Sequence, residues 1–138
     1  MIKLLDILKE NKTKVLVPRR SPEERAKNYQ IALQKKIQQY IKDGGKGDLD
    51  LSNTPITSLP SDLKVGGDLN LNNTPIASLP DNLQVGGGLY LDDTPITSLP
   101  DNLQVGGALY LRNTLLSKKY IKGQIEQMAP GIKGNIYM

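Results

Sequence analysis

The sequence predicts an α+β repeat protein, a short solenoid with a four-stranded parallel sheet that is capped by helices at both ends. Three observations lead to this prediction. Nearly identical stretches of 20 residues begin at Asp48, Asp68 and Gly88, and a fourth copy breaks off after Ser117. Within each copy, leucines alternate with polar residues, as in a short strand with one buried face. On both sides of the repeats, apolar residues recur at helical spacing.

The apolar residues of each repeat occupy the same positions in every copy, as expected for a core shared by stacked coils. Twelve positions are identical in the three full copies, and in the first copy they are Leu49, Leu51, Thr54, Pro55, Ile56, Ser58, Leu59, Pro60, Leu63, Val65, Gly66 and Gly67. Six of them are large aliphatic residues, which one coil cannot bury alone but stacked coils can. The prolines are expected at corners, because they lack an N–H group and hold φ near −65°. The glycine pair that ends each copy is expected to supply a positive φ where the chain re-enters the strand.

The pattern LDLSNTPITSLP, which begins at Leu49, resembles the core of a leucine-rich repeat. It is most similar to the short repeats of bacterial type III effectors, and the resemblance covers residues 48 to 117. A threonine stands where that family has asparagine, at Thr54, Thr74, Thr94 and Thr114. The resemblance therefore implies a threonine column that hydrogen-bonds backbone between coils. The stretch TPITSLPDNLQVGG is also similar to uncharacterised repeat proteins of phage and environmental viral genomes.

Helical caps are expected because a solenoid exposes an apolar face at each end. Ser21, Pro22 and Glu24 are a typical helix start, and the helix is expected to run to about Lys42. One face of this helix carries an apolar stripe made of Ala26, Tyr29, Leu33, Ile37 and Tyr40 with Ile41. This stripe is expected to cover Leu49 and Leu51 of the first coil. The alternative is that it binds a partner. After the repeats, a helix over 117–128 is expected to turn Tyr120, Ile121, Ile125 and Met128 inward, and residues 134–138 are expected to be extended.

The predicted layout is a single domain with four parts. Residues 1–20 are an N-terminal amphipathic segment and arm, and residues 21–46 are the N-terminal capping helix. Residues 47–117 hold three full repeats and one partial repeat, and residues 118–138 are the C-terminal cap. The apolar residues of the first segment make it a candidate for an assembly contact.

Composition excludes several classes of function. The 138 residues include no cysteine and no histidine, which removes disulfides, thiolate nucleophiles, imidazole catalysis and zinc sites made of these residues. Asp48, Asp50 and Asp68 gather carboxylates, but no loop in the sequence encircles an ion. We therefore expect no enzyme activity, no catalytic residue, no cofactor and no metal site. No apolar run of 18 residues occurs and no signal-peptide pattern is present, so we expect cytoplasmic synthesis, no membrane partner and, as an alternative destination, a virion.

Candidate binding residues lie where the copies differ. In a leucine-rich repeat, the residues around the two strand leucines point outward on a concave sheet. Parallel strands lie about 4.8 Å apart, so Tyr90 and Tyr110 should sit side by side, and Asp92 should neighbour Arg112. Exposed tyrosines flanked by small residues are typical of protein-binding hot spots, and solvated surface is the alternative. The candidate protein-binding residues are Tyr90, Tyr110, Asp50, Asn70, Asp92 and Arg112.

Charge suggests a second kind of partner. Residues 1–46 carry twelve basic and five acidic side chains, whereas residues 47–114 carry two basic and eight acidic ones. A basic flank can bind polyanions such as nucleic acid, or it can simply be solvated surface. The candidate polyanion-binding residues are Arg19, Arg20, Arg25, Lys27, Lys35 and Lys36.

The sequence thus favours a non-enzymatic protein-interaction module that presents a small concave repeat surface to another protein. Two alternatives stay open. The first is a phage or virion structural or decoration protein that its N-terminal segment anchors to another subunit. The second is polyanion binding through the basic N-terminal region.

Overall fold

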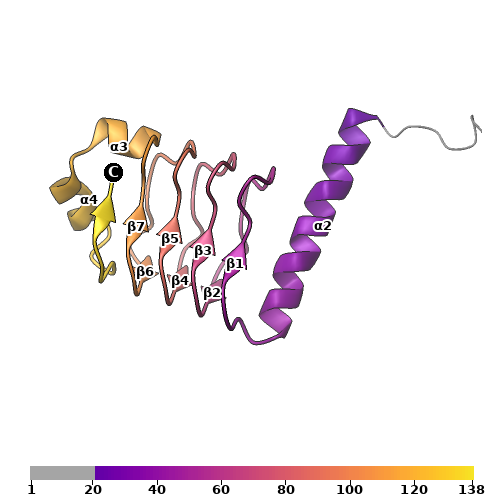
Figure 1. Ribbon diagram of the computed structural model, residues 1–138, viewed down its shortest axis with the longest axis horizontal. Helices are drawn as coiled ribbons and strands as arrows, with labels where there is room; N and C mark the ends of the chain where they lie inside the picture. The colour runs from indigo at the N-terminus through magenta and orange to yellow at the C-terminus, as the bar shows by residue number, and fades with distance from the viewer. Residues whose placement is uncertain (1–20) are drawn as a thin grey trace, which may run out of the picture.

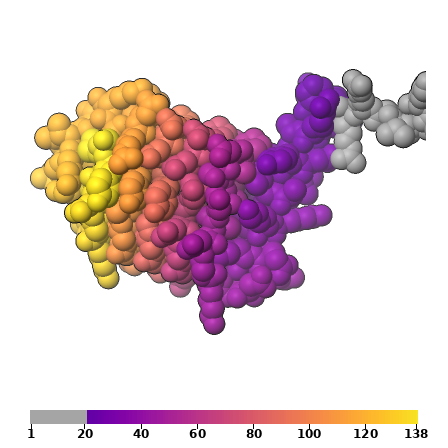
Figure 2. All heavy atoms as spheres, viewed as in Figure 1, coloured from indigo at the N-terminus to yellow at the C-terminus, as the bar shows by residue number. Residues whose placement is uncertain are grey.

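The chain winds into flattened coils of 20 residues that stack along one axis, with one long helix at the first end and two short helices at the other (Figure 1). The structure, a computed structural model, describes residues 21–138. The candidate residues Arg19 and Arg20, and the predicted N-terminal arm, lie outside this range. The coils confirm the predicted parallel-strand solenoid, which is recognisable in Figure 2 as a row of successive bands.

The first sheet contains one strand from each coil and a fifth strand from the C-terminal segment. Its strands run parallel in the order β1 (Leu49–Asp50), β3 (Leu69–Asn70), β5 (Leu89–Tyr90), β7 (Leu109–Tyr110) and β8 (Ile136–Tyr137). Each strand pairs with the equivalent residue one repeat later, so identical positions form columns. The sequence predicts four of these strands. The fifth arises because the extended C-terminal piece returns beside β7.

A second, three-stranded parallel sheet lies on the return side of the coils. Its strands are β2 (Lys64–Val65), β4 (Gln84–Val85) and β6 (Gln104–Val105). The valines point inward and are buried, and the preceding residue of each strand points outward. The core between the two sheets consists of the aliphatic columns that the repeat predicts, and Leu51, Ile56 and Leu63 are almost fully buried in the first coil.

The threonine column behaves differently from the resemblance-based expectation. The hydroxyl of Thr74 donates to the carbonyl of Leu71, three residues earlier in the same coil, at 2.7 Å, and the other threonines of the column repeat this bond. Bonds between coils are made instead by longer side chains, for example from the Gly88 N–H to Asp68 Oδ1 at 2.7 Å. The expected threonine bridge between coils is wrong. Each hydroxyl has a single proton, and its donation to the carbonyl within the coil leaves none for the next coil.

The repeated glycines are also needed for a different reason than the sequence suggests. None of the pairs that end the three full copies lies in the left-handed region, which is occupied by Asn53, Asp62, Asn73, Asn82, Asp93 and Asn113 and by three glycines before the first coil. A Cβ atom at Gly86 would stand 2.3 Å from the Gly66 carbonyl oxygen, and one at Gly106 would meet the Gly86 oxygen at the same distance. The expectation of positive φ is therefore wrong: these positions are glycine because neighbouring coils touch backbone to backbone.

Helix α2 (Pro22–Lys42) covers the first coil. Ser21 is its N-cap and accepts from the Glu24 N–H at 3.1 Å, as the sequence predicts. Leu33 and Ile37 are buried in the core, but Ala26, Tyr29 and Ile41 of the predicted stripe are exposed. Ala26 and Tyr29 are exposed because the first turns of α2 project beyond the coil (Figure 1).

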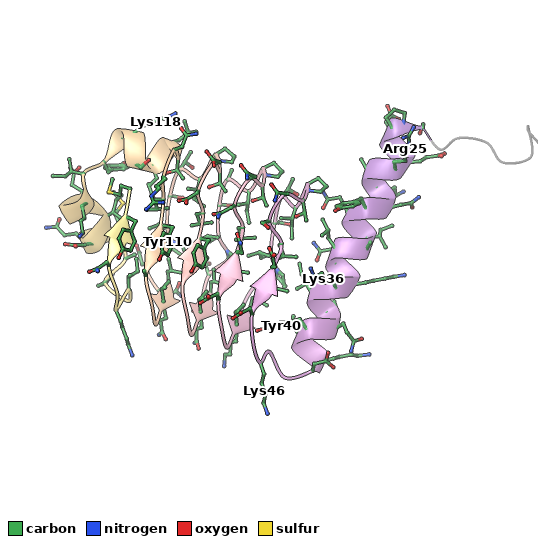
Figure 3. All side chains as sticks on the ribbon, viewed as in Figure 1. Arg25, Lys36, Tyr40, Lys46, Tyr110 and Lys118 are labelled. Atoms are coloured by element: carbon green, nitrogen blue, oxygen red, sulfur yellow. The ribbon has the colours of Figure 1, made fainter. Side chains whose placement is uncertain are left out.

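Side chains of α2 also satisfy polar backbone groups of the first coil. The Lys36 ammonium donates to the Asp50 carbonyl at 2.7 Å, and the Gln30 amide donates to the Pro55 carbonyl. The Tyr40 hydroxyl accepts from the Gly66 N–H at 3.2 Å and lies 2.7 Å from the Gly47 carbonyl oxygen. Figure 3 shows Lys36 and Tyr40 on the side of α2 that faces the first coil. This edge of the solenoid is thus closed by hydrogen bonds as well as by apolar packing.

The C-terminal cap is two helices rather than the single helix predicted for 117–128. Helices α3 (Leu115–Lys119) and α4 (Lys122–Met128) are separated by an extended break at Tyr120 and Ile121. Ile125 is buried as expected, whereas Ile121 is 70% exposed, so its predicted inward position is wrong. The break changes the direction of the chain and lets Leu116 and Ile125 both reach the last coil. Within residues 21–138, no helix has the length and apolar character needed to cross a membrane.

Replacement of Gly86 by alanine should destabilise the solenoid by about 1–3 kcal/mol, because the added methyl group overpacks a backbone contact that has no flexible side chain to move. Urea unfolding followed by circular dichroism measures the change. Gly123→Ala is the matched control, since no atom lies within 4 Å of its added Cβ in α4. Equal unfolding midpoints for Gly86→Ala and the wild type would contradict the close-approach explanation.

Candidate functional site

Three tyrosines stack on the outer face of the first sheet and form what we call the tyrosine ladder: Tyr90, Tyr110 and Tyr137. The ring centroids of Tyr90 and Tyr110 are 4.5 Å apart and their planes differ by 6°. Tyr110 and Tyr137 follow at 4.9 Å and 16°. Figure 3 shows Tyr110 on β7, toward the C-terminal end of this face. The side-by-side placement of Tyr90 and Tyr110 agrees with the register that the sequence predicts.

The sequence analysis does not predict the third ring, Tyr137, although the sequence contains a pattern that indicates it. Ile136 and Tyr137 repeat the aliphatic–tyrosine order of Leu89 and Tyr90, and they pair with β7 in the same register. A large aliphatic residue followed by tyrosine, two positions after a glycine, therefore marks the fifth strand. The signal was hidden because the segment lacks the rest of the repeat.

The spacing of the strands produces the stacking. Equivalent residues on parallel strands lie about 4.8 Å apart, close to the distance at which aromatic rings stack. Gly88 leaves room beside the first ring, since a Cβ atom there would stand 3.2 Å from Cε2 of Tyr90. Stacking turns the ring faces toward each other. The ring edges and hydroxyl groups are consequently the parts available to a partner.

The pKa of the Tyr90 hydroxyl is raised above its ordinary value. The main cause is desolvation beside its neighbours, followed by the negative charge of Asp68 and by the interaction with Tyr110. All three effects disfavour the phenolate. The Tyr90 hydroxyl therefore stays protonated, and able to donate a hydrogen bond, to a higher pH than an isolated tyrosine.

Arg112 lies at the end of the ladder and neighbours Asp92, as the sequence predicts. Its guanidinium carbon is 6.0 Å from the centroid of the Tyr137 ring. Asp92 Oδ1 instead accepts from the backbone N–H of Arg112 at 2.8 Å, and Asn72 Oδ1 accepts from the N–H of Asp92 at 2.8 Å. The carboxylate of Asp92 is thus part of the bonding between coils, and Arg112 adds a cation to the aromatic patch.

Asp50 and Asn70 occupy the same column as the tyrosines but make local turns. Asp50 Oδ1 accepts from the N–H and the hydroxyl of Ser52, at 3.0 and 2.6 Å. These bonds, with a smaller contribution from Lys36, lower the pKa of Asp50. Asn70 Oδ1 accepts from the Asn72 N–H at 3.0 Å. The outer face therefore has a polar half on β1 and β3 and an aromatic half on β5, β7 and β8.

The described basic candidates do not gather in one patch. Lys27 and Lys35 line a hollow of about 610 Å³ along α2, together with Ile31 and Lys42. Lys36 points the other way and donates to the Asp50 carbonyl. Arg25 lies in the exposed first turns. A polyanion following α2 would meet two of these four side chains on the same face.

A second hollow follows the second sheet. Its volume is about 720 Å³, and its long side chains are Lys64, Gln84, Gln104 and Lys133. The exposed backbones of Gly66, Gly86 and Gly106 line it as well. The region that the structure describes contains no group of three His, Cys, Asp or Glu residues placed to hold a metal ion.

Comparison of the chain with protein-family models, with curated proteins and with solved structures finds no significant match. The solenoid architecture is supported by the internal repeats of the sequence and by the parallel sheets of the structure.

The pH titration of Tyr90 can be tested directly. The ring resonances of Tyr90, followed by NMR, should titrate above the ordinary tyrosine value, and Asp68→Asn should lower that pKa because it removes a negative charge while keeping the Oδ1 acceptor. A raised pKa means that the stabilising contribution of the protonated phenol is present below the unfolded-state pKa and is lost as pH rises through the folded-state pKa. Asp101→Asn, on an exposed turn, is the control. An unchanged Tyr90 titration in Asp68→Asn would contradict the assigned cause.

Proposed function

We propose that this chain is a non-enzymatic protein-interaction module of the leucine-rich-repeat type, and that its partner binds the outer face of the first sheet at the tyrosine ladder. The observation that carries the proposal is the stack of three tyrosine rings on adjacent strands. Tyrosines on a solvent-facing sheet are apolar surface with hydrogen-bonding tips.

The physical properties of the ladder support binding. Tyrosine supplies a large contact area with few rotatable bonds, and stacking restrains the rings before a partner arrives. Less side-chain entropy is then lost on association. Arg112 beside Tyr137 adds a second residue type that is enriched in hot spots. Gly88 and Ala108, which precede β5 and β7, have no side chain or a small one, so they add little bulk around the rings.

The orientation of the rings favours a protein over a carbohydrate. A sugar ring packs on the flat face of an aromatic ring, and in the ladder the inner faces are already covered by other tyrosines. Along the stack, the ring edges and the hydroxyl groups remain available to a partner. These groups suit the backbone carbonyls and carboxylates of a protein surface.

The leucine-rich-repeat assignment has sequence features in its favour: the 20-residue period, the Leu–Pro step and one short strand per coil. The threonine column, which bonds within its own coil, departs from that family's pattern. The virion and polyanion alternatives depend on residues 1–20 and on basic residues that α2 spreads over different faces. The tyrosine ladder, by contrast, is built entirely from described residues.

The decisive test is the double variant Tyr90→Thr with Tyr110→Thr, which keeps β-propensity while it removes two rings. Partners that copurify with the full chain from its native source should be identified, and their affinity for each variant measured by calorimetry. Loss of a hot spot worth about 2 kcal/mol or more should weaken binding at least about thirtyfold.

Tyr29→Thr is the matched control, because Tyr29 is 47% exposed on α2 and lies outside the ladder. Its partner affinity should equal that of the wild type. A double variant that keeps both its urea midpoint and full partner affinity would refute the proposal.

A further inference from the structure

The two ends of the tyrosine ladder have different surroundings. At the end formed by Tyr137, the guanidinium carbon of Arg112 lies 6.0 Å from the ring centroid, so a cation borders the stack there. At the other end, one face of the Tyr90 ring stacks on Tyr110, with 4.5 Å between the ring centroids. Because β5 lies between β3 and β7, the second face of the Tyr90 ring is directed toward β3. This ring face is the feature from which the inference starts.

The side chain that β3 places opposite Tyr90 does not cover this ring face. Asn70 pairs with Tyr90 in the sheet, and its Oδ1 accepts from the Asn72 N–H at 3.0 Å, which turns the amide toward Asn72. The Tyr90 ring leans the opposite way along the strand, over Gly88. A Cβ atom at Gly88 would stand 3.2 Å from Cε2 and 3.5 Å from Cζ of Tyr90, and Gly88 itself is buried. The two side chains therefore diverge and leave room beside the ring.

Two carboxylates lie near the hydroxyl end of the same ring face. Asp48 Oδ1 accepts from the Asp68 N–H at 2.8 Å, and Asp68 Oδ1 accepts from the Gly88 N–H at 2.7 Å. These bonds fix the two carboxylates in one column at the spacing of the coils, and they use only one oxygen of each. After desolvation, the charge of Asp68 and, more weakly, that of Asp48 are among the causes that raise the pKa of Tyr90. Both carboxylates are thus within electrostatic reach of the ring.

The outward columns of the first sheet carry an excess of negative charge. Their charged residues are Asp48, Asp50, Asp68, Asp92 and Arg112. In the described part of the chain, the hydrogen bonds of these four carboxylates come from backbone N–H groups and from the Ser52 hydroxyl. The one guanidinium lies at the Tyr137 end. A protein that covers the Tyr90 end therefore meets negative charge beside an aromatic ring, and positive charge on the partner complements it.

We infer that the partner of the tyrosine ladder places an arginine side chain beside Tyr90, with the guanidinium stacked on the ring face that looks toward β3 and its N–H groups donating to Asp68 and Asp48. The inference rests on the protein-binding function proposed above and adds the chemistry of the residue that is recognised. A guanidinium is flat, so it can occupy the next level of the stack, and its donors lie in its plane. Asp68 belongs to the coil at that level, so its carboxylate meets the edge of this plane. Arg112 beside Tyr137 pairs the same two residue types within the chain.

The probe for the test is Nα-acetylarginine amide, which carries a guanidinium and no other charge. Titrated into the 138-residue chain at low salt, it should shift the NMR resonances of the Tyr90 ring and of the Asp68 backbone amide in a saturable way. Added salt should weaken this binding, because the carboxylates are solvent-accessible. Nα-acetylcitrulline amide has nearly the same shape without the charge. It should bind at least about threefold more weakly.

The matched protein variants separate the carboxylate from the ring. Asp68→Asn keeps the Oδ1 acceptor for the Gly88 N–H and removes the charge, so affinity for the arginine probe should fall about threefold to fivefold. Tyr90→Thr removes the ring face and should cause a loss of similar size. Asp101→Asn, on an exposed turn, is the control and should bind the probe like the wild type.

Three results would overturn the inference. The first is the absence of a saturable shift with the arginine probe, and the second is equal affinity for the arginine and citrulline probes or for wild type and Asp68→Asn. The third is a dimer of the chain in sedimentation experiments that Asp68→Asn dissociates, because a second copy would then occupy this face.

Failure of the inference can be distinguished from failure of the proposed function. If the copurified partner is lost from the double variant Tyr90→Thr with Tyr110→Thr but binds Asp68→Asn with wild-type affinity, the ladder binds a protein without the arginine contact, and only the inference is refuted. If the partner binds the double variant with full affinity, the proposed function is refuted, whatever the arginine probe does. Weakened partner binding by both variants supports the two together.

Discussion

The close approach of successive coils is the constraint on which the rest of this structure depends. Backbone touches backbone where Gly86 meets Gly66 and Gly106 meets Gly86, and no side chain fits between them. The contact holds every coil in register with the next, displaced by one repeat of 20 residues. The buried aliphatic columns, the hydrogen bonds from Asp and Asn side chains to the next coil and the tyrosine ladder all require that register.

The same constraint links architecture to binding chemistry. A residue type that recurs in adjacent copies becomes a continuous stripe on the surface, at a spacing set by the sheet. In the first two coils the outer column is Asp50 and Asn70, which bond to their own turns. In the later coils it is tyrosine, which stacks on its neighbours. A change of a few residues between copies thus converts one end of the face from polar to aromatic without any change in the fold.

Much of this could be predicted from the sequence, because internal repetition makes each copy a check on the others. The spacing of the repeats predicts the parallel coils, the buried columns and the pairing of Tyr90 with Tyr110. Helix-capping rules predict the Ser21 cap. What could not be predicted depends on distances between coils. The glycines are limited by the approach of a neighbouring carbonyl, while the break at Tyr120 and the strand at Ile136 are set by packing on the last coil. A single copy contains none of this information.

The position of the tyrosine ladder along the stack gives the polar coils a role as a spacer. The two coils that begin at Asp48 and Asp68 separate helix α2 from the first ring, and they are nearly interchangeable in sequence. Each contacts mainly its immediate neighbours, so one copy can be gained or lost by unequal recombination of the repeated gene segment with little effect on the others. Every such event would move the aromatic end by one step of about 4.8 Å relative to α2. The distance between α2 and the aromatic end of the sheet is therefore set by the number of coils that the gene encodes.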